Sequence, residues 1–72
     1  MWKTIELDGF KIQMKVYETG SEYGIEKGRI SKLNIREIGK TMDLANYDRG
    51  WDTVPQNLKV IEAYNKVLKM YN

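Results

Sequence analysis

The chain has 72 residues, of which 12 are basic and 10 acidic, so its formal net charge at neutral pH is only +2. This length allows a single small domain, residues 1–72, with one modest core and little room for a deep cleft. Cysteine and histidine are both absent, which excludes disulfides, thiolate metal sites and the usual catalytic base, so we predict a non-enzymatic protein without a metal or cofactor.

The chain also lacks the sequence features of export and of membrane insertion. No apolar run has the length of a signal-peptide core or approaches the roughly 20 residues of a membrane span. We therefore expect a cytoplasmic protein without a membrane partner.

Two alternating segments near the start predict an antiparallel hairpin. Apolar side chains occupy every second position of residues 10–16, which is the period of a half-buried strand. Between the two segments, Asp8-Gly9 suits the positive φ angles of a two-residue type I′ turn. The side chains expected to face the core are Ile5, Leu7, Phe10, Ile12, Met14 and Val16.

A third strand is predicted after an irregular segment, residues 18–28, that is rich in glycine and carboxylates. Residues 29–38 alternate again, and we expect Ser31, Leu33 and Ile35 to point into the core. The irregular segment would be mobile unless one of its apolar residues packs against the body of the domain.

The fourth predicted strand is less regular. Gly39-Lys40 marks a turn, after which residues 41–47 are expected to return antiparallel to the third strand. Because its apolar side chains do not keep one parity, we expect a bulge within it. Those side chains are Met42, Leu44, Ala45 and Tyr47.

After residue 51 the apolar period changes from two to about 3.6, which indicates an amphipathic C-terminal helix. Residues 53–56 fit a capping box and Pro55 suits a first helical turn, so we expect the helix to begin there. The predicted fold is α+β: a four-stranded antiparallel meander packed against one C-terminal helix, ββββα, in two layers. The inward face of the helix is expected to carry Leu58, Ile61, Tyr64, Leu68 and Tyr71, flanked by Val60 and Val67.

Residues 47–52, Tyr-Asp-Arg-Gly-Trp-Asp, form the first candidate site. Arginine and tryptophan dominate protein interfaces, so this segment at the sheet-to-helix junction is a candidate for partner binding. A structural role is the alternative: Gly50 would allow a turn, Trp51 would close the end of the core and Asp52 would help to cap the helix. The candidate partner-binding residues are Tyr23, from the irregular segment, and Tyr47, Asp48, Arg49, Trp51 and Asp52.

The outward positions of the second and third strands form a second candidate site. If these strands are neighbours, their basic and amide side chains make a platform that can follow a phosphate backbone and stack a base. Glu6 and Asp43 would lie on the same face and cancel part of its charge, and an ordinary solvated face is the alternative. The candidate nucleic-acid-binding residues are Lys11, Lys15, Tyr17, Lys32 and Arg36, with the amides of Gln13 and Asn34 between them.

Three blocks of sequence stand out as a set: Ser21-Glu22-Tyr23-Gly24-Ile25, Gly28-Arg29-Ile30-Ser31-Lys32-Leu33, and residues 47–52 followed by Pro55. Together they resemble a family of very small uncharacterised proteins of phages and prophages. The resemblance implies a setting, the cytoplasm of a bacterial host cell, and no chemistry. It also implies a way of acting, because small phage accessory proteins commonly bind a host protein, including components of host defence.

The preferred hypothesis is a non-enzymatic protein-binding module, such as a phage-encoded inhibitor of a host defence factor, with Arg49, Trp51 and Tyr23 as anchors. The alternative is a small nucleic-acid-binding domain, and a binder of small phosphorylated molecules is a third hypothesis. A homodimer is also open, because so small a chain gains stability by pairing a free sheet edge.

Overall fold

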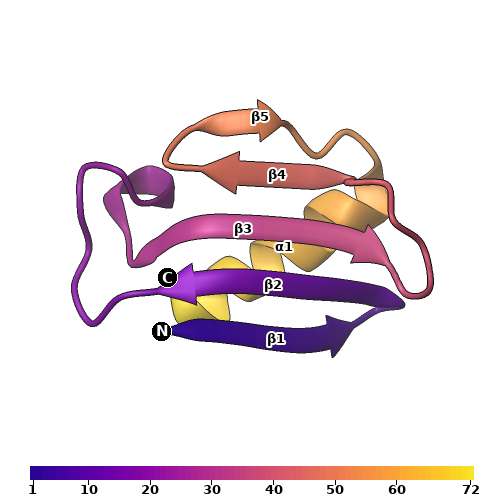
Figure 1. The fold of residues 1–72 in the computed structure, drawn as a ribbon, viewed down its shortest axis with the longest axis horizontal. Helices are drawn as coiled ribbons and strands as arrows, with labels where there is room; N and C mark the ends of the chain where they lie inside the picture. The colour runs from indigo at the N-terminus through magenta and orange to yellow at the C-terminus, as the bar shows by residue number, and fades with distance from the viewer.

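The computed structural model describes all 72 residues as one sheet with one helix behind it (Figure 1). The five strands pair in chain order, each antiparallel to the next, so the sheet is a meander. The predicted α+β architecture is confirmed, with one short strand more than expected. The elements are β1 (Trp2–Leu7), β2 (Phe10–Val16), the 3-10 helix η1 (Ile25–Lys27), β3 (Ile30–Glu37), β4 (Ala45–Asp48), β5 (Trp51–Thr53) and α1 (Leu58–Tyr71).

The hairpin of β1 and β2 forms as predicted. Its two strands pair along the whole of β1. Asp8 and Gly9 connect them with φ angles of 54° and 85°, the left-handed conformation that a type I′ turn needs at both central positions. The turn sets the register, and the register directs Ile5 and Leu7 toward the core.

β3 begins with an irregularity that changes which residue enters the core. Its pairing with β2 shifts register between Lys15 and Val16, so that Ile30 lies opposite Val16. Ile30 is fully buried in the core, whereas Ser31, although also buried, lines a hollow on the opposite face. The expectation that Ser31 points into the core is wrong, because a bulge interrupts strict alternation.

β4 is shorter than expected. It begins at Ala45, whereas residues 41–44 form a connection in which the Leu44 amide donates to the Ile35 carbonyl at 2.8 Å. Met42 is exposed and belongs to this connection. The parity of Met42 and Leu44 therefore differed because they belong to the connection, whereas β4 itself has one irregularity, between Asn46 and Tyr47, in its pairing with β5.

β5 is the strand that the sequence pattern does not predict. It pairs with β4 through a register shift between Asn46 and Tyr47. β5 has only three residues, with Asp52 at the centre, so the sequence shows no alternation of apolar and polar side chains there. β5 forms one edge of the sheet and β1 the other (Figure 1). Because β5 is short, few backbone groups are left unpaired at its edge.

α1 begins later than the capping signals predict. Its N-cap is Asn57, whose side-chain oxygen accepts a hydrogen bond from the Lys59 amide at 2.8 Å. The expected start at residues 53–56 is wrong, because Thr53 still belongs to β5 and Pro55 disfavours a helical residue before it. The expected capping role of Asp52 is wrong for the same reason.

The inward face of α1 is narrower than expected. Val60, Ala63 and Val67 are its buried residues, and Tyr64, Leu68 and Tyr71 are partly buried against the core. Ile61, also expected on the inward face, is half-buried and does not pack against the core. Leu58 is 76% exposed, so its assignment to the inward face is wrong: the helix begins with this residue, at the rim of the sheet. No helix in the structure is both long enough and apolar enough to cross a membrane.

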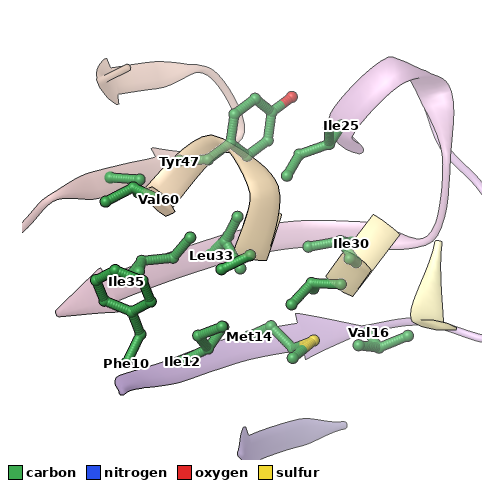
Figure 2. Packing of buried hydrophobic residues seen from close by; sticks show 13 residues of the cluster. Phe10, Ile12, Met14, Val16, Ile25, Ile30, Leu33, Ile35, Tyr47 and Val60 are labelled. Atoms are coloured by element: carbon green, nitrogen blue, oxygen red, sulfur yellow. The ribbon is translucent and has the colours of Figure 1, made fainter. Parts of the chain in front are cut away.

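The core lies between the sheet and α1 (Figure 2). Most of it comes from the inward sides of β2 and β3, and each large aliphatic side chain that it buries contributes about 1.5–3 kcal/mol to folding. The buried apolar residues are Phe10, Ile12, Met14, Val16, Ile25, Ile30, Leu33, Ile35, Ala45, Tyr47, Val60, Ala63 and Val67.

The irregular segment between β2 and β3 is held in place. Ile25 is buried in the core beside Tyr47 (Figure 2), and the Tyr47 hydroxyl donates to the Tyr23 carbonyl at 2.9 Å. The Ser21 amide donates to the Gly28 carbonyl at 3.2 Å, which closes the segment on itself. Ile25 is therefore the apolar residue that fixes this segment to the domain.

The end of α1 is tied to the start of β3. The Arg29 guanidinium donates two hydrogen bonds, at 3.0 and 2.8 Å, to the Tyr71 carbonyl, where helix carbonyls carry partial negative charge. The Asn72 side chain accepts from the Ile30 amide at 2.9 Å and donates to the Ile25 carbonyl at 3.0 Å. One asparagine thus links the helix end, β3 and the irregular segment.

This link depends on the absence of a side chain at Gly28. We expect Gly28→Ala to lower the free energy of unfolding by about 1–2 kcal/mol, because its β-carbon would collide with the Asn72 side chain and displace it from both hydrogen bonds. In an Asn72→Ala background the same change should cost less than about 0.5 kcal/mol, since the obstacle is gone. Chemical denaturation of the four proteins measures both values, and equal costs in the two backgrounds would contradict the link.

Candidate functional site

The face of the sheet turned away from α1, called here the outer face, points toward the viewer in Figure 1. Antiparallel pairing places the outward side chains of neighbouring strands opposite one another, so the register defines rows across the sheet. The first row is Trp2, Lys15, Lys32 and Asp48, the second is Thr4, Gln13, Asn34, Asn46 and Thr53, and the third is Glu6, Lys11 and Arg36.

The third row is nearly neutral. Lys11 stands opposite Glu6, and the Arg36 guanidinium pairs with the Asp43 carboxylate at 2.7 Å. Hydrogen bonds from Asn34, and then from Arg36, hold the pKa of Asp43 below its ordinary value. The expectation that Glu6 and Asp43 cancel part of the charge of this face is confirmed.

The first row leads into a hollow of about 510 Å³, at the end of the sheet where β2 stops and β3 begins. Lys15, Lys32 and Arg49 line it. The carboxylate nearest to them is that of Asp48, whose oxygen lies 3.8 Å from the Lys32 nitrogen and 3.5 Å from that of Arg49. Both ion pairs are long and exposed, so they contribute little to stability and leave the cations available to a ligand.

Three exposed aromatic side chains stand around these cations. Trp2 is 59% exposed, Tyr17 46% and Tyr23 63%. The Lys32 nitrogen lies 6.0 Å from the centre of the Trp2 ring, and the Lys15 nitrogen lies 5.3 Å from that of Tyr17, both within the range of a cation–π interaction. An exposed ring beside an ammonium can stack a flat ligand while the ammonium meets an anion.

Lys15 also changes the chemistry of the Tyr17 hydroxyl. A hydrogen bond from the Lys15 side chain lowers the pKa of Tyr17, and the charges of Lys15 and Lys32 and a hydrogen bond with Ser31 add to this effect. Positive charge near a phenol favours its ionised form. The basic side chains beside Tyr17 therefore favour the ionised form of this one residue of the hollow.

The turn between β4 and β5 places Arg49 at this hollow. Arg49 has a φ angle of 58°, and its amide donates to the Ser31 carbonyl at 3.0 Å. Gly50 does not have a positive φ angle. The expectation that Gly50 allows the turn is therefore wrong, and the left-handed residue is Arg49, held by its bond to β3.

Tyr47 and Trp51 lie on the inner face, away from Arg49. Tyr47 is 8% exposed, so its assignment as a partner-binding residue is wrong: its ring is part of the core. The Trp51 ring packs edge-on against Tyr47, with ring centres 5.1 Å apart, and against Tyr64 of α1 at 5.5 Å. Trp51 thus closes the end of the core, as the structural alternative predicts, while 38% of it stays exposed.

The structure unites parts of the two candidate sites and separates others. Arg49 and Tyr23 of the partner-binding set meet Lys15, Tyr17 and Lys32 of the nucleic-acid-binding set around one hollow. The remaining candidates lie elsewhere: Lys11 and Arg36 in the third row, Asp48 beside the hollow, Asp52 exposed on the edge strand, and Tyr47 and Trp51 on the inner face.

Trp2 is a residue that sequence analysis misses. It stands opposite Lys15 at the start of the first row. A signal for it exists, because Ile5 and Leu7 point inward and counting back along the strand directs Trp2 outward. Trp2 and Tyr23 raise the number of aromatic rings at this end of the outer face from one to three.

The hollow presents groups suited to binding an anion. Cations, hydroxyls and flat rings surround it, and charge-assisted hydrogen bonds to an anion are the strongest polar contacts that such a surface can make. The structure contains no group of three or more acidic side chains that could hold a metal ion.

A protein family described as a domain of unknown function (DUF7678) matches residues 1–72, the whole chain. The chain belongs to this family. No curated protein and no solved structure matches it. The family description names no activity.

The conformation of Arg49 gives a test of the turn. We expect Arg49→Gly to be more stable than Arg49→Ala by about 1 kcal/mol, because glycine adopts a positive φ angle without strain. Gly50→Ala should change the free energy of unfolding by less than about 0.5 kcal/mol, since an added β-carbon meets no neighbouring atom. Chemical denaturation compares the three variants, and a larger loss from Gly50→Ala would mean that the glycine makes the turn after all.

The pKa values of Tyr17 and Tyr64 shift in opposite directions, which gives a test of the charges at the hollow. We expect Tyr17 to ionise at a lower pH than Tyr64, because Lys15 lowers the pKa of Tyr17 whereas burial, with the Glu26 charge adding to it, raises that of Tyr64. In an ultraviolet absorbance titration, Tyr17→Phe should remove an early part of the curve and Tyr64→Phe a late part. The reverse assignment would show that Lys15 does not lower the pKa of Tyr17.

Proposed function

We propose that this protein binds single-stranded nucleic acid on its outer face, with the hollow as the strongest part of the site. The observation that carries the proposal is the meeting of three exposed aromatic rings with three cations at one end of the sheet. A single strand offers phosphates to the cations and unstacked bases to the rings, whereas a duplex keeps its bases stacked inside.

The distribution of charge supports this proposal more than the net charge does. The whole chain carries only +2, and the third row of the outer face is nearly neutral. Lys15, Lys32 and Arg49 line the hollow, and Asp48 beside it is paired with Lys32 and Arg49. A local excess of positive charge attracts a polyanion even when the rest of the surface is balanced.

The second row supplies neutral hydrogen-bonding groups beside the hollow. Thr4 and Gln13 are exposed on neighbouring strands and stand opposite each other. Hydroxyl and amide groups at such positions can contact base edges or a ribose hydroxyl. The outer face therefore combines the three kinds of contact that single-stranded nucleic acid uses: charge, stacking and hydrogen bonding.

A protein-binding role, such as that of a phage-encoded inhibitor of a host factor, is the second candidate. A run of exposed apolar side chains beside the edge strand favours it: Trp51, Val54 and Leu58 are all exposed, and such residues form anchors in protein interfaces. Because Arg49 and Trp51 face opposite sides of the sheet, such a partner would contact Trp51 and Leu58 but not the hollow.

Fluorescence polarisation with labelled oligonucleotides tests the first proposal. We expect binding of single strands at about 50 mM salt, with an affinity that falls steeply as salt rises because each phosphate contact releases counterions. Lys15→Gln and Lys32→Gln should each reduce the slope of log affinity against log salt by about 0.7–1. Trp2→Ala should weaken binding by about 1–3 kcal/mol for each base that it stacks.

Two controls separate this result from general charge effects and from the second candidate. Lys59→Gln removes the same charge from an exposed position on α1 and should leave the slope unchanged. Leu58→Ala changes the proposed protein contact at a side chain that is 76% exposed, and it should leave oligonucleotide affinity unchanged. Absence of binding to any oligonucleotide at low salt would reject the proposal, and equal losses from Lys15→Gln and Lys59→Gln would reject the outer face as its site.

A further inference from the structure

The irregular segment borders one end of the hollow. The irregular segment, called here the wall, lies beyond the ends of β2 and β3 (Figure 1), and Ser21 and Tyr23 of that segment line the hollow. The wall is rigid, because Ile25 anchors it in the core and the Tyr17 amide donates to the Arg29 carbonyl at 2.9 Å at its base. A nucleotide chain that follows the outer face toward this end of the sheet meets the wall, so we expect the end of the chain to lie there.

The positive charge beside the wall is greater than the single negative charge of a phosphate inside a nucleotide chain. A phosphodiester carries one negative charge, whereas a terminal phosphomonoester carries about −1.5 to −2 at neutral pH and has three strong acceptor oxygens. Lys15, Lys32 and Arg49 come from β2, β3 and the β4–β5 turn, so three separate elements bring cations to one place. Asp48 is paired with two of these cations, so the cations exceed this carboxylate by two charges, which suits a dianion better than a monoanion.

Neutral groups at the same place add to this match. The Ser21 hydroxyl oxygen accepts a hydrogen bond from the Tyr23 amide at 3.3 Å, which leaves the hydroxyl hydrogen free to donate to a phosphate oxygen. The exposed rings of Tyr17 and Tyr23 line the hollow beside the cations, so a base attached to that phosphate has a surface to stack on.

We infer that the hollow takes the terminal phosphate of a nucleotide, at the end of a single strand or on a free mononucleotide, with Lys15, Lys32 and Arg49 on the phosphate. This inference rests on the proposed function and makes it more specific, because it gives the site a preference for a phosphorylated end over an interior position. Asp48 opposes this ligand, since its carboxylate competes with the phosphate for Lys32 and Arg49.

The experiment compares three oligonucleotides of one sequence at low salt, with a 5′-phosphate, a 5′-hydroxyl or a 5′-methylphosphate, and the same set at the 3′ end. We expect one phosphorylated end to bind about tenfold more tightly than its hydroxyl and methylphosphate counterparts, because the additional charge meets an additional cation. Arg49→Gly should remove this preference while its turn stays intact, and Asp48→Asn should increase it. Lys59→Gln is the control and should leave the preference unchanged.

A second arm uses a deoxynucleoside monophosphate and its nucleoside, followed by amide chemical shifts in nuclear magnetic resonance. We expect the monophosphate alone to shift the amides of Ser21, Ser31 and Arg49. Oligonucleotide binding without any end preference would overturn this inference and leave the proposed function standing. Monophosphate binding at the hollow without oligonucleotide binding would support the phosphate site and overturn the proposed function, and absence of both would overturn both.

Discussion

The pairing of β2 with β3 is the constraint on which the rest of the structure depends. These central strands supply most of the core on one side and the cations of the first row on the other. Their single register shift, between Lys15 and Val16, sends Ile30 into the core and leaves Ser31 at the hollow. Because side chains alternate between the two faces of a sheet, one inserted residue decides the composition of both.

The same elements that stabilise the small core also build the candidate site. Ile25 fills the core and thereby fixes the wall of the hollow, while the Tyr47 ring is buried and its hydroxyl holds the backbone of that wall at Tyr23. Asn72 ties the end of α1 to the wall and to β3. A domain of this size has few residues, so the same side chains both pack the core and position the hollow. We therefore expect ligand binding at the hollow to be sensitive to changes in the core.

The sequence predicts the two candidate sites only where their residues lie in regular strands. Lys15 and Lys32 were assignable to one face because each lies in a strand with clear alternation. Arg49 and Tyr23 could not be added to them, because both lie outside the strands, and alternation says nothing about where a turn or an irregular segment directs a side chain. Tyr47 and Trp51 belong to the same short motif as Arg49 and nevertheless face the opposite side of the sheet.

By itself, the sequence determined the α+β class, the type I′ turn at Asp8-Gly9, most of the core of β2 and β3, and an amphipathic C-terminal helix. Each of these features follows from local periodicity or from the conformational preference of one or two residues. The tertiary structure alone decided the fifth strand, the start of α1 at Leu58 with Asn57 as its cap, the left-handed conformation of Arg49 and the assembly of the hollow. These features depend on contacts between residues far apart in the chain, such as the bond from the Arg49 amide to the Ser31 carbonyl, and no local pattern encodes such contacts.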